Sequence, residues 1–169
     1  MSWEIKTVSE IASPKKHSMS TGPFGSAISS KYFLDSGIPI IRGKNLSEDV
    51  GVRLSDKNLV FLSSVKAEKF KRSIARQGDI IFTCWGTINQ IGLIDKRASY
   101  EEYVVSNKQM KLTIDSSKAD YLFLYYQFSS PMVQQEILNN NLGGAIPGFN
   151  LGQLKKFKVQ IPPLQTQNA

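Results

Sequence analysis

The sequence predicts an α+β fold in a single domain. Its 169 residues, 41% of them hydrophobic, suffice to bury one core and are too few for several domains. Apolar runs of strand length fill the first two thirds of the chain, whereas the last third changes to helical spacing. We therefore expect one compact domain with a small mixed sheet and hairpins, followed by a pair of C-terminal helices.

The N-terminal part is expected to hold a lead-in, a loop and a strand. Apolar residues over 3–11 have partly helical spacing, and Pro14 ends that segment. Residues 15–30 are rich in Gly, Pro and Ser, which is typical of a loop. The β-branched run at 37–42 predicts a strand, and the polar residues that follow it through Asn45 place hydrogen-bonding groups at its tip.

The middle of the chain predicts further strands around one short helix. The apolar residues 59–62 precede Ser63 and Ser64, which suit the N-cap of a helix that runs through Phe70. Residues 80–84 are apolar without alternation, so we expect a strand buried on both faces, paired as a hairpin with 91–94. Two more short strands are expected at 104–105 and 110–114.

The C-terminal third predicts two helices and an edge strand. Asp120 suits the N-cap of a helix over 121–128, and Ser130 followed by Pro131 begins a second helix, where the missing N–H of proline costs nothing. Residues 155–161 alternate Lys or Gln with apolar side chains, a pattern that predicts a half-exposed edge strand.

Charge and cysteine content narrow the class of protein. The net charge of +7 attracts phosphate backbones or anionic surfaces. No apolar run approaches the roughly twenty residues that span a bilayer, and the charged N-terminal residues exclude a signal peptide. The single cysteine, Cys84, excludes an internal disulfide and favours a reducing compartment. We expect a cytoplasmic protein that does not contact the membrane.

Several enzyme signatures are incomplete in this sequence. Residues 37–45 resemble a phosphate-binding loop but have the wrong gap and end in Asn where Ser or Thr binds the metal. A nuclease would need an Asp before the Glu4–Lys6 pair. Cys84 and His17 suit a thiol nucleophile and its base, but a cysteine that ends an apolar strand is more often a small core residue. We expect no catalytic site, no metal and no cofactor.

Hydrogen-bonding side chains gather in three loops instead. Arg and Lys match the acceptor pair of guanine, and Asn and Gln can bond adenine at two points. Turn formation alone would account for one such loop, whereas three of them in a basic chain favour nucleic acid. The loops contain Arg42, Lys44 and Asn45; Thr87, Asn89 and Gln90; and Asn107, Lys108 and Gln109.

Two basic stretches and one tryptophan add to this pattern. Lysines and arginines recur over 66–76 and again over 155–158, where they suit contacts to phosphates, with a solvated surface as the alternative. Trp85 stands beside Gly86, where it suits either stacking on an unpaired base or packing within the protein.

Taken in order, these segments resemble the target-recognition domain of the specificity (S) subunit of type I restriction–modification systems. Their order and spacing over nearly the whole chain are specific, although no single motif is. The segments lie at 3–11, 22–26, 37–46, 78–92, 121–137 and 143–167.

The resemblance implies a non-catalytic role in reading DNA. Such a domain recognises one half of a bipartite site in double-stranded DNA and directs methyltransferase (modification) and restriction subunits, which supply methylation and cleavage. A second recognition domain or a homodimer stays open as a further partner. The alternative is a non-catalytic assembly domain that contacts protein partners or binds nucleic acid non-specifically.

The same resemblance sets the expected boundaries and contacts. Residues 1–161 are expected to form the DNA target-recognition domain, and 162–169 the truncated start of the spacer-helix region, with the long spacer helix of the family missing. The residues expected to bind DNA are Lys15, Lys16, Ser26, Arg42, Lys44, Asn45, Thr87, Asn89, Gln90, Lys108, Gln109, Lys155 and Lys158.

Overall fold

Strands and helices alternate irregularly along residues 2–168, the part of the chain that the computed structural model describes. The strands are β1 (Glu4–Thr7), β2 (Met19–Thr21), β3 (Ile38–Ile41), β4 (Val60–Leu62), β5 (Ile74–Ala75), β6 (Ile80–Thr83), β7 (Ile91–Leu93), β8 (Tyr103–Val105), β9 (Gln109–Leu112) and β10 (Lys158–Ile161). The α-helices are α1 (Val8–Ile11), α2 (Ser64–Glu68), α3 (Tyr121–Phe128), α4 (Pro131–Asn139), α5 (Leu151–Lys156) and α6 (Leu164–Gln167). Short 3-10 turns are η1 (Gly25–Ile28), η2 (Ser30–Tyr32), η3 (Gly43–Asn45) and η4 (Lys71–Ser73). The α+β prediction is confirmed.

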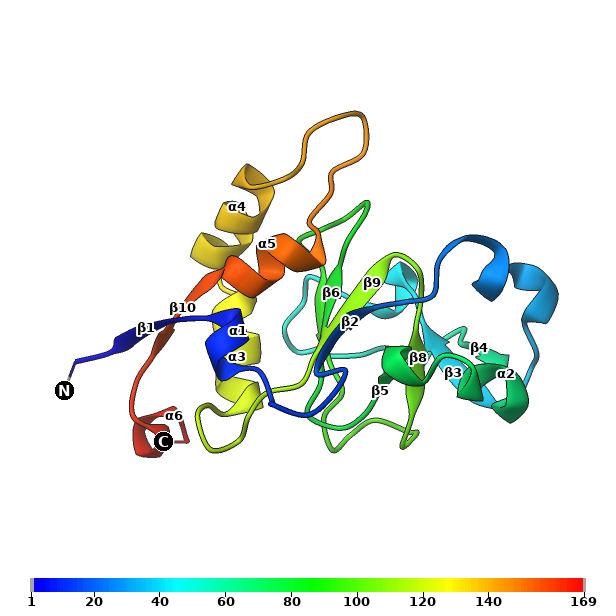
Figure 1. The fold of residues 1–169 in the computed structure, drawn as a ribbon, viewed down its shortest axis with the longest axis horizontal. Coiled ribbons are helices and arrows are strands. Elements are labelled where there is room, and N and C mark those ends of the chain that lie inside the picture. The colour runs from blue at the N-terminus through cyan, green and yellow to red at the C-terminus, as the bar shows by residue number, and fades with distance from the viewer. Residues whose placement is uncertain (1, 169) are drawn as a thin grey trace.

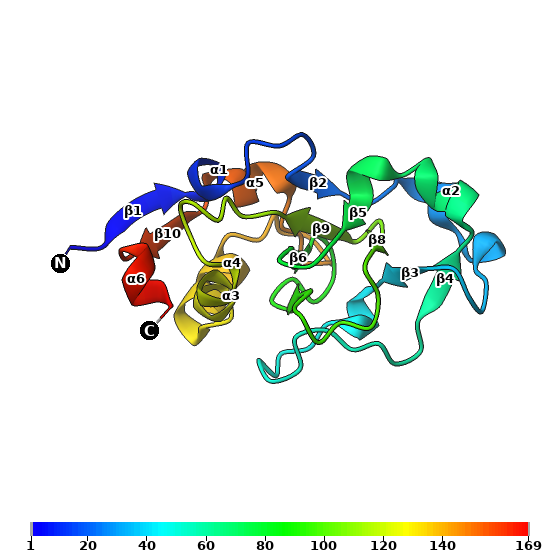
Figure 2. The same ribbon diagram turned by 90° about the horizontal axis from the view of Figure 1, so that it is seen from below.

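The strands divide among three sheets within residues 2–168, where the sequence predicted one. A central antiparallel sheet has the order β2-β9-β6-β7. A second sheet, of order β4-β3-β8-β5, is mixed, because β3 runs parallel to β8 while its other pairs are antiparallel. β1 pairs with β10 and brings the two ends of the chain to one side of the molecule (Figures 1 and 2).

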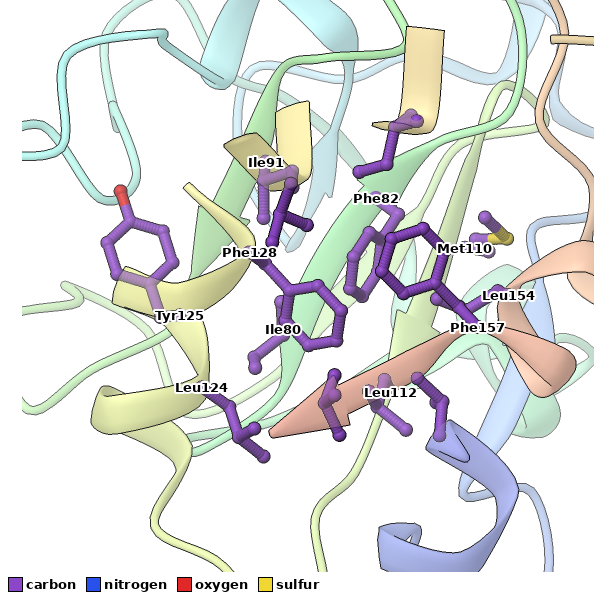
Figure 3. Close-up of a cluster of buried hydrophobic side chains, with 14 of the residues drawn as sticks. Ile80, Phe82, Ile91, Met110, Leu112, Leu124, Tyr125, Phe128, Leu154 and Phe157 are labelled. Carbon is purple, nitrogen blue, oxygen red and sulfur yellow. The ribbon is translucent and has the colours of Figure 1, made fainter. Parts of the chain in front are cut away.

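Strand β6 is buried on both faces, as its uninterrupted apolar run predicted. Ile80 and Phe82 face the largest core, which α1, α3, α4 and α5 cover. The Phe82 ring meets that of Phe128 on α3 edge to face, with 4.9 Å between ring centroids (Figure 3). Ile81 points the opposite way, into a second core shared with Tyr103 of β8. The period of two in a strand thus lets β6 serve both cores.

A buried ion pair joins the central sheet to the second one. The Lys111 ammonium group on β9 donates a hydrogen bond to the carbonyl oxygen of Ile74 on β5 at 2.7 Å and lies 3.7 Å from the Asp79 carboxylate. Asp79 also accepts hydrogen bonds from the Arg76 N–H at 2.9 Å and the Thr113 hydroxyl at 2.5 Å. Burial raises the pKa of Asp79, and Lys111 opposes that shift.

The predicted helix caps are confirmed. The side chains of Ser63, Asp120 and Ser130 each accept a hydrogen bond from a backbone N–H in the first turn of α2, α3 and α4, respectively. Pro131 occupies the first turn of α4, where its missing N–H has no helical partner to lose.

The predicted secondary structure was wrong for two segments. Residues 155–161 form a strand only from Lys158 onward, because 151–156 are helical. Asn150 and Gln153 start that helix by exchanging side-chain to backbone hydrogen bonds at 2.8 Å each. The loop predicted over 15–30 contains β2, which pairs with β9 through the register Ser20 to Lys111.

We predict that Lys111→Met lowers the free energy of unfolding at pH 7 by about 3–5 kcal/mol, because it leaves a buried carboxylate without its cation. Burial already raises the pKa of Asp79, so protonation favours the folded state, and the variant should regain stability as the pH falls from 7 towards 5. Urea denaturation followed by circular dichroism measures both effects.

The double variant Lys111→Met/Asp79→Asn is the control for this pair. It should recover much of the loss and should lack the gain at lower pH. A single variant within about 1 kcal/mol of the wild type would contradict the role of the ion pair.

Candidate nucleic-acid interface

An open groove of about 710 Å³ lies among the loops at the ends of β3, β6 and β8. The three polar loops predicted from the sequence meet there. They follow β3, connect β6 to β7, and connect β8 to β9. The polar side chains that line the groove are Arg42, Lys44, Thr83, Thr87, Gln90, Ser106, Asn107, Lys108 and Gln109.

Strand directions explain why these loops meet. The parallel strands β3 and β8 end at the same edge, where the Ser106 N–H donates to the Ile41 carbonyl oxygen at 3.0 Å. Strand β6 is antiparallel to β9, so its end lies beside the start of β9, and the Cys84 N–H donates to the Lys108 carbonyl oxygen at 2.7 Å. Backbone hydrogen bonds therefore fix the loops and leave their side chains available.

The groove is cationic. Lys44 and Lys108 are exposed at its margin, Arg42 is half-buried, and no described residue that lines the groove is acidic. The Arg42 guanidinium lies 5.5 Å from the centroid of the Phe33 ring and donates to the Asn58 carbonyl oxygen at 3.2 Å. Its buried Nε–H has no hydrogen-bond partner among the described residues.

The structure brings six of the predicted contact residues into this groove: Arg42, Lys44, Thr87, Gln90, Lys108 and Gln109. Of these, Gln109 is buried and accepts a hydrogen bond from the Ser106 hydroxyl, which fixes its amide. Seven others do not line the groove: Lys15, Lys16, Ser26, Asn45, Asn89, Lys155 and Lys158.

Asn45 supports the groove from within the protein. It is fully buried, and its Oδ1 accepts from the Arg42 N–H at 3.0 Å. Its Nδ2 donates to the carbonyl oxygens of Ser55 at 3.0 Å and Lys57 at 3.2 Å. Asn45 thus connects the loop that carries Lys44 to residues 55–57 of the segment that precedes β4.

The remaining predicted residues lie in other places. Lys16 borders a separate depression beside α2, together with Arg76 and Lys111. Lys155 ends α5 and Lys158 begins β10, and Lys158 borders a shallow pocket against α4. Ser26 is exposed in η1, and the Asn89 side chain donates to Glu48 at 3.4 Å.

Sequence reasoning missed the apolar part of the groove. Ile28 and Phe33 line it from the η1 and η2 region, which was predicted only as loop. Trp85 also lines it, is 45% exposed, and packs one part of its ring against Gly148, so it is not a fully buried core residue. A Phe three residues after the Ser-rich segment was the available signal for Phe33, but a single aromatic residue does not indicate which surface it joins.

The interpretation of Cys84 as a core residue is confirmed. The side chain is buried, and burial raises the pKa of its thiol to about 12, which favours the neutral, unreactive form. Within residues 2–168 no three His, Cys, Asp or Glu side chains gather in a way that suits a metal ion. Among the helices of the described chain, none has the length and apolar character to cross a membrane.

The family model of the type I restriction modification DNA specificity domain matches residues 2–169. The chain belongs to this family. This chain matches no curated protein sequence.

Solved structures of type I systems share the fold of this specificity domain. An S subunit from M. genitalium superposes with a TM-score of 0.60 at 14% identity, over 94% of this chain and 34% of its own. The HsdS subunit from Thermoanaerobacter tengcongensis gives 0.64 at 14% identity, over 99% and 35%. A chain from a study of complex assembly and conformational transition of the type I R-M system gives 0.67 at 13% identity, over 99% and 36%. The specificity domain spans about a third of the length of these chains.

We predict that Asn45→Ala lowers the free energy of unfolding of the specificity domain by about 2–3 kcal/mol, because three part-buried backbone hydrogen bonds lose their side-chain partner. Lys44→Ala, one residue away and exposed, should change it by less than about 0.5 kcal/mol. Thermal and urea unfolding of both variants measure the difference. Equal effects would show that Asn45 has no supporting role.

Proposed function

We propose that this specificity domain binds double-stranded DNA in a sequence-dependent manner through the groove at the ends of β3, β6 and β8. The observation that supports the proposal is the meeting of three loops with cationic and amide side chains in one groove free of acidic residues. Cations attract the phosphate backbone, and amide and guanidinium groups match base edges in the major groove.

The positions of the side chains suggest two roles. Lys44 and Lys108 are exposed at the margin, where flexible ammonium groups suit phosphates. Arg42 and Gln90 are half-buried along the groove, where they suit base edges. We assign positioning on the duplex to the first pair and discrimination between sequences to the second pair.

The assembly around this domain is part of the same proposal. Because the domain spans only about a third of the solved S-subunit chains, we assign to it one half of a bipartite target. Methyltransferase and restriction subunits would supply methylation and cleavage, and this chain would recognise the target sequence. The complex would act in the cytoplasm. Residues up to 161 would form the recognition unit, and α6 would begin the spacer region.

Selection from a randomised duplex pool, followed by fluorescence anisotropy at two salt concentrations, tests the proposal. An enriched motif of a few base pairs whose preference persists at the higher salt supports it. Binding that disappears with salt and enriches no motif overturns sequence-specific recognition and favours the alternative, a non-catalytic assembly domain.

We predict that Lys44→Ala and Lys108→Ala each weaken binding to all duplexes alike. Each should flatten the slope of log affinity against log salt by about one unit, because each removes one phosphate contact. Anisotropy titrations over a salt series measure the slope.

Lys96→Ala is the matched control for these variants. Lys96 is exposed beyond the far end of β7, which pairs with the start of β6, so it lies opposite the groove. Its substitution removes the same charge and should leave the slope unchanged. A change equal to that of the groove variants would indicate non-specific attraction by net charge.

A further inference from the structure

The loop 142–148, between α4 and α5, projects from the body of the molecule at the top of Figure 1. Two of its apolar side chains are largely exposed, Leu142 by 49% and Ile146 by 60%. Trp85, which lines the groove, lies at the base of the loop and is 45% exposed. Three large apolar side chains are thus exposed at one margin of a polar groove.

Backbone hydrogen bonds anchor the base of this loop. The Leu142 N–H donates to the Gly148 carbonyl oxygen at 2.9 Å and closes the loop on itself. The Gly86 N–H donates to the Pro147 carbonyl oxygen at 3.0 Å. Gly148 packs against the Trp85 ring, where an added Cβ would come within 2.4 Å of a ring carbon. The attachment to the groove therefore depends on contacts that tolerate no side chain at 148.

A tight turn at Gly143 and Gly144 forms the tip of the loop. Gly143 and Gly144 have φ of +76° and +91°, a conformation that side chains rarely adopt. The Asn141 side chain accepts a hydrogen bond from the Gly143 N–H at 2.7 Å and holds the turn. Folding thus keeps Leu142 and Ile146 in water on an ordered loop, where exposure gives no gain in stability.

The positive charge of the adjacent groove indicates which kind of molecule the 142–148 loop would contact. Arg42, Lys44 and Lys108 attract a polyanion, and Trp85 belongs both to the groove and to the base of the loop. A duplex seated in the groove would therefore meet the loop. Architectural DNA-binding proteins insert apolar side chains such as Leu and Ile between base steps and partly unstack them.

We propose that the 142–148 loop is an apolar wedge that enters the duplex beside the groove and unstacks a base step, with Trp85 as its support. The proposal rests on the proposed DNA binding and adds to it a deformation of the DNA. The energy of that deformation depends on the sequence, so the wedge also contributes to recognition at a step without polar contacts.

Duplexes from the bound fraction of the selection, with 2-aminopurine placed at successive positions, test the wedge. Stacking quenches this base, so binding of the wild-type domain should raise its fluorescence several-fold at one or two adjacent positions. The variant Leu142→Ser/Ile146→Ser should lose that rise and bind about tenfold more weakly. Ile146→Phe should retain the rise.

Val65→Ser is the matched control, since Val65 is 73% exposed on α2 and does not line the groove. It should leave fluorescence and affinity unchanged. All variants are at exposed positions, and unchanged thermal unfolding verifies their fold. Tight binding by the wild-type domain without any rise in fluorescence overturns the wedge and leaves the proposed function intact. Absence of binding to every duplex overturns both.

Discussion

The pairing of β6 with β9 is the constraint on which the rest of the structure depends. Ile80 and Phe82 on one face of β6 hold the helices, and Ile81 on the other face holds the second sheet. The same pairing places the end of β6 beside the start of β9, so that Thr83 lies opposite Gln109 at the groove. One antiparallel pair therefore determines both how the cores are divided and where the loops meet.

The Lys111–Asp79 pair also connects the two sheets, but burying its two charges costs desolvation free energy. Both side chains are buried, and desolvation alone would disfavour their charged forms. Hydrogen bonds to Ile74, Arg76 and Thr113 offset that penalty and hold β5 and the turn before β6 in register with β9. Unlike an apolar contact, these directional bonds specify which atoms of the two sheets meet.

The sequence predicted local elements well and their assembly poorly. The apolar run at 80–84 and the caps at Ser63, Asp120 and Ser130 follow from burial and backbone hydrogen bonding within a few residues. The helix α5 was missed because it is only six residues long and its last two residues belong to the alternating segment 155–161. The parallel pairing of β3 with β8 links residues far apart in the chain, so no local pattern predicts that the three polar loops meet.

The way the groove is built explains why a fold of this kind persists at 13–14% identity to solved structures with TM-scores of 0.60–0.67. Backbone hydrogen bonds, such as those from Cys84 to Lys108 and from Ser106 to Ile41, hold the loops in place without help from their exposed side chains. Exposed residues such as Lys44 add little to stability, so their replacement changes the chemistry of the groove without weakening the scaffold. The backbone of these strand ends therefore carries the fold, and the exposed side chains on the same loops can change without a new fold.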